Sequence, residues 1–272
     1  MIIKGVDLAG YDFHKVNSDY LFKQGLNFIV GENASGKTTI LNSIISGFTA
    51  ETYQEHWIHP PLESNQEPII AIEFQYQEET YCITKKIKKD GIECQLYAIN
   101  ERKEGSLVCE GAEAIERIKQ YSNEIIYLRG EEIQSMHHQL GILNPDEQSL
   151  PEFQMLLNEL LLTYDAFGYW GDKQVAIVEG QFLVRGLDGS ISGILAAGGI
   201  SYLVFMSIIT SIKMNKNCPI LILDDWDGGM TNYQLDILSR CLTELDSQVI
   251  LSSHSMHRPN LEVEANMIHL NR

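Results

Sequence analysis

The sequence predicts an α/β protein in which a mixed sheet with flanking helices is joined to an antiparallel β subdomain. Three observations predict this class. An apolar strand at 26–30 runs through a glycine-containing loop into an amphipathic helix at 38–46. Residues 69–100 alternate apolar and polar side chains around an Asp-Gly turn signal, which predicts an antiparallel hairpin or meander. The strand–helix–strand order of residues 220–252 predicts parallel pairing.

The remaining elements follow from hydrophobic periodicity. A leucine stripe at helical spacing predicts the helix at 232–245, and Pro151 at the first turn supports the apolar helix at 150–164. Further helices are predicted at 112–121 and 201–214, and further strands at 2–8, 125–128, 175–178, 182–184 and 267–270. No internal repeat or domain-separating linker interrupts this order.

The composition is that of a globular protein with an acidic surface. Hydrophobic residues make up 44% of the 272 residues, which is too apolar for a disordered chain. There are 20 Lys and Arg against 37 Asp and Glu, a net charge of −17. This charge excludes nucleic-acid or anionic-membrane binding over the whole surface, so any such contact needs a local basic patch.

The pattern predicts a cytoplasmic protein without a membrane span. The N-terminal residues show no secretory signal, and the five widely spaced cysteines are interpreted as reduced thiols. Residues 189–212 carry no charge and are long enough to cross a membrane. We expect no span there, because Gly193, Gly198 and Gly199 weaken a helix and a second buried strand follows.

A phosphate-loop motif follows the strand at 26–30. Its eight residues are Gly31, Glu32, Asn33, Ala34, Ser35, Gly36, Lys37 and Thr38. Backbone N–H groups of such a loop surround phosphates, Lys37 reaches the β- and γ-phosphates, and the Thr38 hydroxyl ligates Mg²⁺. Because a strand precedes the motif and a helix follows it, the sequence predicts nucleoside-triphosphate binding.

Two acids end a buried strand farther along the chain. Residues 220–223 are all apolar and lead into Asp224 and Asp225. A carboxylate beside a phosphate loop can hold Mg²⁺, and the next acid can orient or polarise an attacking water. His254 follows the strand at 249–252 and is a candidate sensor of the γ-phosphate.

Together these motifs resemble the ABC-type ATPase superfamily. Residues 195–199, Leu-Ala-Ala-Gly-Gly, are similar to the superfamily's signature sequence, which lies between the phosphate loop and the acidic motif. The opening strands and the antiparallel stretch at 69–99 are similar to the soluble SMC/RecF-like branch of DNA-repair and anti-phage proteins. Since no heptads occur, the chain resembles a head without the long coiled-coil arm.

The resemblance implies a single two-lobed ATPase domain over 1–272. Lobe I would comprise residues 1–130, with the phosphate loop and the antiparallel hairpin. Residues 131–175 would form a short helical insert, and residues 176–272 would form lobe II. Two protomers would sandwich two ATP molecules, each between the phosphate loop of one protomer and the signature glycines of the other.

The same resemblance implies roles for individual residues. Besides the phosphate loop, the ATP-binding residues would be Thr39, Gly198 and Gly199. The Mg²⁺ ligands would be Thr38, Asp224 and Gln134, with Glu131 as the alternative to Gln134. The catalytic residues would be Lys37, Asp225 and His254.

Two departures from the resembled pattern favour slow turnover. Ala196 stands where the signature has a serine, so a hydroxyl that contacts the opposing γ-phosphate is missing. Asp225 stands where the catalytic glutamate is usual, and its side chain is one methylene shorter, so the water must lie closer. These changes favour slow hydrolysis of ATP to ADP and phosphate, or an ATP-gated switch.

A dense basic cluster lies on the strand before the predicted turn. Its members are Lys85, Lys86, Lys88 and Lys89. In the resembled branch this lobe faces DNA, which makes the cluster a candidate DNA surface. The alternative, favoured by the net charge, is a solvated edge strand that lysines protect from aggregation.

The leading hypothesis is an ATPase that forms a homodimer on ATP and drives or licenses an effector such as a nuclease. A role in DNA maintenance or anti-phage defence rests on family analogy alone. Two alternatives stay open. One is a nucleotide-binding subunit of a membrane transporter, and the other is a non-hydrolysing ATP sensor or scaffold, which Ala196 and Asp225 suggest.

Overall fold

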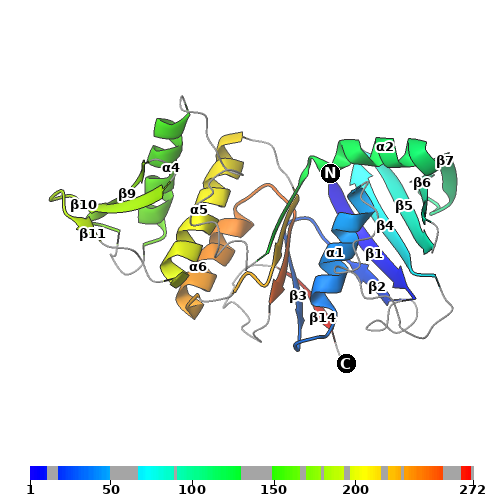
Figure 1. Ribbon diagram of the computed structural model, residues 1–272, viewed down its shortest axis with the longest axis horizontal. Helices are drawn as coiled ribbons and strands as arrows, with labels where there is room; N and C mark the ends of the chain where they lie inside the picture. The colour runs from blue at the N-terminus through cyan, green and yellow to red at the C-terminus, as the bar shows by residue number, and fades with distance from the viewer. Residues whose placement is uncertain are drawn as a thin grey trace.

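The computed structural model describes residues 1–10, 18–49, 67–88, 91–129, 149–165, 170–178, 181–192, 197–215, 220–227, 230–253 and 265–270. It contains a parallel sheet and an antiparallel sheet with a helix between them, and a layer of helices on the other side of the parallel sheet (Figure 1). The predicted α/β class with an antiparallel subdomain is confirmed. Parallel and antiparallel strands lie in separate sheets.

The parallel sheet has five strands and positions the site. Their order is β14 (Asn266–Leu270), β3 (Leu26–Gly31), β13 (Val249–Ser253), β12 (Ile220–Asp224) and β8 (Ile125–Arg129). Every pair is parallel, so the carboxyl ends meet at one edge of the sheet. Because β12 and β13 are buried on both faces, each begins with a run of apolar residues rather than an alternating pattern, and their buried polar residues lie at the carboxyl ends.

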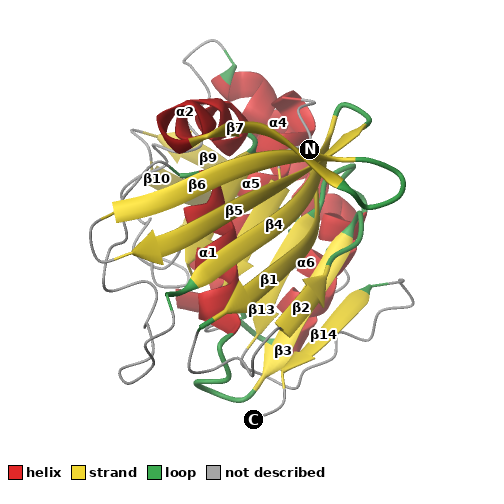
Figure 2. Cartoon of the chain, turned by 90° about the vertical axis from the view of Figure 1, so that its right-hand side faces the viewer, coloured by secondary structure: helices red, strands yellow, loops and turns green. Residues whose placement is uncertain are grey.

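The antiparallel sheet has six strands, seen face-on in Figure 2. Their order is β2 (Ser18–Leu21), β1 (Ile2–Ala9), β4 (Ile69–Tyr76), β5 (Glu79–Lys88), β6 (Gly91–Ile99) and β7 (Gly105–Glu110). The predicted meander over 69–100 is confirmed as β4 to β6. The two outer strands, β2 and β7, were missed because they are short and their sequences do not alternate clearly.

Helix α1 (Lys37–Phe48) lies between the two sheets and packs against both. Its apolar side chains share one core with strands of each sheet and with α2 (Gly111–Ser122). Gly47 marks the closest approach, since a Cβ there would lie 2.0 Å from Ile72 Cδ1 on β4. A larger residue at Gly47 would have to displace the Ile72 side chain, so glycine favours the close packing of α1 on the antiparallel sheet.

On the other side of the parallel sheet, the described part of the chain forms a layer of three helices (Figure 1). They are α4 (Leu150–Thr163), α5 (Ala197–Asn215) and α6 (Asn232–Thr243), and beside them lies a small sheet of β9 (Lys173–Val178), β10 (Gln181–Gly186) and β11 (Ile191–Ser192). A capping box between Thr231 and Gln234 begins α6. Most of the uncharged stretch at 189–212 forms α5, whose described side chains pack into the core. Within the described ranges, no helix combines the length and apolarity that crossing a membrane requires.

Lys85 is not a surface residue. Its side chain is 4% exposed, and its amine donates to the carbonyl oxygens of Ser46 at 2.7 Å and Thr49 at 2.6 Å. These carbonyls belong to the C-terminal end of α1, where a cation also complements the helix dipole. Lys85 therefore joins β5 to α1 and is unavailable to DNA.

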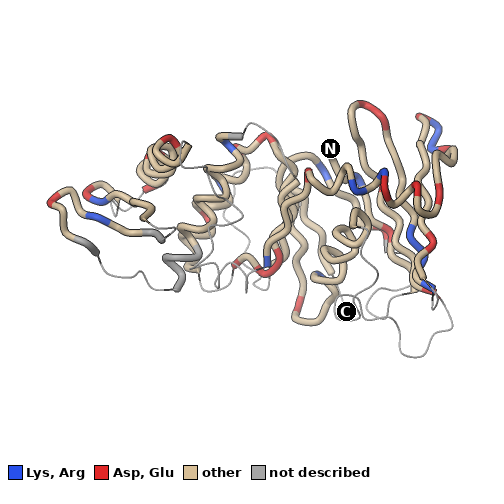
Figure 3. The backbone as a smooth tube through the Cα atoms, turned by 45° about the horizontal axis from the view of Figure 1, so that its top comes forward, with Lys and Arg blue, Asp and Glu red and all other residues tan. Residues whose placement is uncertain are grey.

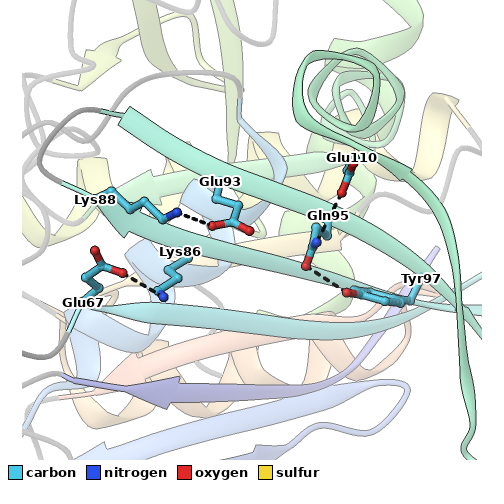
Figure 4. Close-up of polar contacts among 7 residues, drawn as sticks. All are labelled: Glu67, Lys86, Lys88, Glu93, Gln95, Tyr97 and Glu110. Atoms are coloured by element: carbon cyan, nitrogen blue, oxygen red, sulfur yellow. Dashed lines mark hydrogen bonds and ion pairs between the residues drawn. The ribbon is translucent and has the colours of Figure 1, made fainter.

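The other lysines of the cluster face acids (Figure 4). Lys86 pairs with Glu67 at 2.8 Å and Lys88 pairs with Glu93 at 2.6 Å, while Lys89 lies outside the described residues. The edge-strand interpretation was wrong, because β5 lies between β4 and β6. Figure 3 shows acidic and basic segments interspersed on this sheet. The described lysines therefore do not form the unpaired basic patch that a DNA surface needs.

Candidate nucleotide-binding site

The phosphate-loop motif connects β3 to α1 at the carboxyl edge of the parallel sheet. Ala34 and Gly36 have φ angles of 60° and 94°, and Ser35 N donates to Glu32 O at 3.2 Å. Gly36 is the N-cap of α1, and a glycine adopts this left-handed conformation without steric cost. The N-terminal end of α1 therefore opens into the loop, where its free N–H groups favour an anion.

Gly31 allows the loop to close on itself. A Cβ at this position would lie 2.5 Å from Ser35 Oγ and 3.0 Å from Leu270 Cβ on β14. The 2.5 Å contact is shorter than real Cβ atoms show, so a larger residue would displace the Ser35 hydroxyl, and Leu270 leaves little room on the other side. Packing therefore favours a glycine at the first position of the motif.

The Lys37 side chain lies over the loop and contacts its backbone. Its side chain is 4% exposed, and its amine donates to the carbonyl oxygens of Gly31 and Glu32, each at 2.9 Å. Ser35 Oγ is buried nearby and has no hydrogen-bond partner among the described residues. An ammonium group and an unsatisfied hydroxyl beside open backbone N–H groups fit the oxygens of a phosphate chain.

Two oxygen donors meet next to the loop. Asp224 ends β12 and is 3% exposed, and the Thr38 hydroxyl at the start of α1 donates to Asp224 Oδ1 at 3.3 Å. Ser252 on β13 donates its hydroxyl to the same carboxylate oxygen. A hydroxyl and a carboxylate beside a phosphate site are ligands that Mg²⁺ prefers, so these residues fit a magnesium ion.

The charge of Asp224 is costly in this position. Burial raises the pKa of Asp224 above its ordinary value, and the neighbouring Asp225 raises it further. The hydrogen bonds from Ser252 and Thr38 and the charge of Arg129 lower this pKa, but they do not cancel the burial. A bound cation would relieve the same cost.

Asp225 stands directly after the strand in an unusual backbone conformation. Its φ is 52°, and its N–H donates to Ser252 Oγ at 2.9 Å. Ser252 thus contacts both acids, and the next serine, Ser253, donates to Asp227 Oδ2 at 2.6 Å. The end of β13 therefore holds the acidic loop that follows β12.

Three residues of this neighbourhood were missed in the sequence analysis. Asn42 lies one turn after Thr38 on α1, and its Oδ1 accepts from the Tyr127 hydroxyl at 2.9 Å and from Arg129 Nη2 at 3.4 Å. Arg129 Nε also donates to the Tyr127 hydroxyl at 3.1 Å, and Arg129 is the register partner of Asp224. The available signal was the position of Arg129 at the end of a predicted strand, where site residues gather in parallel sheets.

The other predicted site residues fall into two groups, those that the structure describes and those outside the described residues. Thr39 is half-buried in the first turn of α1, and Glu32 and Asn33 are exposed on the loop. Gly198 and Gly199 lie in the first turn of α5. The remaining predicted positions lie outside the described residues, namely Glu131, Gln134, Ala196 and His254.

This fold and site define a P-loop nucleotide-binding protein of the ATPase-head type. A family model described as AAA domain matches residues 10–160, more than half of the chain. The chain belongs to this AAA domain family. No curated protein matches it in sequence.

Solved structures of SMC head domains share the fold. An SMC head domain from Thermotoga maritima matches with a TM-score of 0.63 at 18% identity, covering 94% of this chain and 90% of that chain. An SMC head bound to the C-winged helix domain of ScpA matches with a TM-score of 0.70 at 13% identity and the same coverage. A third structure is an SMC head with an extended coiled coil, bound to the C-terminal domain of ScpA derived from Pyrococcus furiosus. It matches with a TM-score of 0.59 at 12% identity, covering 93% and 90% of the two chains.

The chain therefore has the fold of an SMC-like ATPase head without the coiled-coil arm, as the sequence predicts. Only residues 130–149 separate β8 from α4, which is too few for a long coiled coil.

Proposed function

We propose that this chain binds Mg·ATP between the phosphate loop and the acidic end of β12, and hydrolyses it slowly. One observation carries the proposal. Thr38, Asp224 and Ser252 come from three separate elements and converge beside loop 31–38. Such a convergence of an oxygen-donor pair with a phosphate loop is the arrangement that phosphoryl transfer from a nucleotide needs.

Each residue has a role in this proposal. The Lys37 amine exchanges its two carbonyl partners for β- and γ-phosphate oxygens. Thr38 and Asp224, together with Gln134, would hold Mg²⁺, which would supply positive charge beside the phosphates. Asp225 accepts the proton of the attacking water. The Ser252 contact with the Asp225 N–H holds that acid in position.

ATP-gated homodimerisation completes the proposal. Helix α5 begins at Ala197, so the N–H groups around Gly198 and Gly199 are available to the γ-phosphate of a second protomer. His254 would contact the γ-phosphate of the other ATP, the one bound by its own protomer. The dimer would drive or license a partner protein, such as a nuclease, in DNA maintenance or anti-phage defence. The SMC heads bound to ScpA domains support a head of this fold as a docking site for another protein.

A non-hydrolysing ATP sensor is the second candidate. It is favoured by Asp225, whose short side chain lies within 3.5 Å of Ser252 Oγ. A side chain one methylene shorter than glutamate reaches less far toward an attacking water molecule. No described contact favours a transporter subunit.

Substitution of Lys37 tests the binding proposal. Mg·ATP is expected to raise the Tm of the wild type, because a ligand that binds only the folded state stabilises it by mass action. Lys37→Ala is expected to fold but to lose most of this shift, and an equal shift in both proteins would overturn the site.

Phosphate release by the wild type separates the ATPase from the sensor. Light scattering with ATP and with ADP tests dimerisation, and Asp225→Asn is expected to accumulate the ATP dimer.

A further inference from the structure

Trp226 lies next to the candidate nucleotide site but has no role in the proposed chemistry. It follows Asp225 directly, yet it points into the core on the opposite face of the parallel sheet from α1. Its side chain is 3% exposed and belongs to the core cluster shared by β3, β12, β13, α4, α5 and α6. Asp224 instead faces α1. Ile220 and Ile222 lie on the same face of β12 as Asp224, and they pack in the core cluster that contains α1.

Two aromatic rings hold Trp226 from different sides. Phe28 lies on β3, three residues before Gly31, and its ring centroid is 6.4 Å from that of Trp226. Phe205, on α5, meets Trp226 edge-to-face at 6.1 Å with an interplanar angle of 89°. These separations lie in the range of favourable aromatic pairs. One side chain thus contacts the strand of the phosphate loop and the helix that begins with the signature glycines.

Shape rather than hydrogen bonding holds the indole in place. Its N–H is buried and has no hydrogen-bond partner within the described part of the chain. The residue before it has a φ of 52°, a conformation that side chains other than glycine seldom adopt. A buried indole wedged between two rings therefore fixes the direction in which the chain leaves Asp225.

We propose that Trp226 is a positioning residue that couples the nucleotide site to helix α5. The inference rests on the proposed function, because it requires ATP to bind beside Asp225. Any movement of the Asp225 backbone on nucleotide binding must displace the adjacent indole. Close-packed interiors transmit such displacements, so the ring pushes on Phe205 and resets the N-terminal turn of α5.

Through this coupling, ATP bound to one protomer alters the N-terminal end of α5 in that protomer. In the proposed dimer, this end of α5 contacts the ATP bound to the second protomer. The phosphate loop acts on the protomer's own nucleotide, whereas Gly198 and Gly199 act across the proposed dimer. Trp226 belongs to the acidic loop, and its ring contacts Phe205 on α5. The arrangement makes the signature end of α5 responsive to the nucleotide in the same chain.

Hydrogen exchange measures this coupling directly. The amide exchange of residues 197–215 is compared with and without Mg·ATP in the wild type, Trp226→Leu, Trp226→Phe and Trp170→Leu, while calorimetry measures ATP binding separately. Trp170 is a matched control because it is 6% exposed in the same core cluster. The ratio of exchange rates with and without ATP is the readout, since general loosening of the core affects both rates.

The wild type is expected to exchange at least threefold more slowly in α5 when ATP is bound. Trp226→Leu is expected to lose this difference while its Kd for ATP changes less than tenfold, Trp226→Phe to recover part of it, and Trp170→Leu to keep it. If Trp226→Leu does not fold, Phe205→Leu removes the same contact from α5 and is expected to behave alike.

Three results overturn the coupling. They are a wild type that binds ATP without protection of α5, full protection in Trp226→Leu, and loss of protection in Trp170→Leu as well. A wild type that gives no binding heat overturns the proposed function instead, and the inference falls with it.

Discussion

The Asp224 carboxylate shows how a residue of the candidate site can lower the stability of the protein that carries it. Its pKa in the folded protein is raised by burial, so the folded state binds this proton more tightly than the unfolded chain does. The free energy of unfolding therefore falls as the pH rises through the interval above 3.8, the ordinary pKa. At neutral pH the ionised carboxylate is a net cost until a cation neutralises it.

Replacing Asp224 by Asn is expected to raise the Tm at pH 7 without Mg²⁺. The amide oxygen still accepts from Thr38 and Ser252, but the buried charge is gone. The gain should disappear below about pH 3.8, where the wild-type carboxyl is protonated in both states. With Mg·ATP present the order should reverse, because the variant cannot hold the metal. Asp246→Asn, at an exposed position, is the control, and an unchanged or lower Tm for Asp224→Asn would contradict the assigned cost.

Ser252 is expected to be essential to turnover, because one hydroxyl serves both acids. Ser252→Ala leaves the Asp225 N–H without this acceptor and removes one of the two hydroxyl donors to Asp224, the other being Thr38. We expect a loss of about 1–3 kcal/mol in the free energy of unfolding and at least a tenfold fall in kcat. Ser207→Ala removes a buried hydroxyl that bonds within α5 and should leave kcat unchanged. Equal activity in the two variants would argue against a role for Ser252 in the site.

At the scale of elements, Lys85 ties the antiparallel sheet to the helix of the phosphate loop. Lys85→Met removes both hydrogen bonds to the end of α1 and should lower the free energy of unfolding by about 1–3 kcal/mol. Lys86→Met, which breaks an exposed ion pair, should change it by less than about 0.5 kcal/mol. Denaturant unfolding with both variants measures the difference, and equal losses would remove the special role of Lys85.

The pH dependence of the free energy of unfolding, compared between the wild type and Lys85→Met, gives a second test. Burial lowers the pKa of Lys85 from its ordinary 10.5, so the unfolded chain binds this proton more tightly than the folded protein does. The wild type therefore gains stability relative to Lys85→Met as the pH rises toward 10.5. A difference between the two proteins that stays constant from pH 7 to 10 would show that the amine is not desolvated.

At the scale of the whole molecule, a buried amide joins the two sheets at the edge opposite the site. Gln248 precedes β13, and its side chain accepts from Ile3 N at 2.8 Å and donates to Ile3 O at 2.7 Å and Lys23 O at 3.0 Å. Gln248→Ala should lower the free energy of unfolding by about 2–4 kcal/mol, since it leaves buried backbone groups of β1 unpaired. Gln95→Ala is the control, because this half-buried amide bonds the side chains of Tyr97 and Glu110 rather than backbone groups of β1. A similar small loss in both variants would show that water replaces the amide of Gln248.

The sequence by itself determined the phosphate loop, the helix after it and the acidic end of β12. Each is a contiguous segment whose residues impose their own backbone conformation or burial, as Gly36 does at the start of α1. Alternation in residues 69–100 likewise determined which side chains face the core. It did not show that β5 is a central strand, because the pattern identifies a face of a strand and not its neighbours.

The tertiary structure decided which distant residues form hydrogen bonds with one another. Asn42 and Arg129 are 87 residues apart, Thr38 and Asp224 are 186 apart, and Lys85 reaches a helix end that no local pattern connects to it. Such contacts depend on strand order and on which helix covers which sheet. A hydrogen bond between distant residues has no periodic signature in the chain, so Ser252, Arg129 and the burial of Lys85 emerged only when the sheets were assembled around α1.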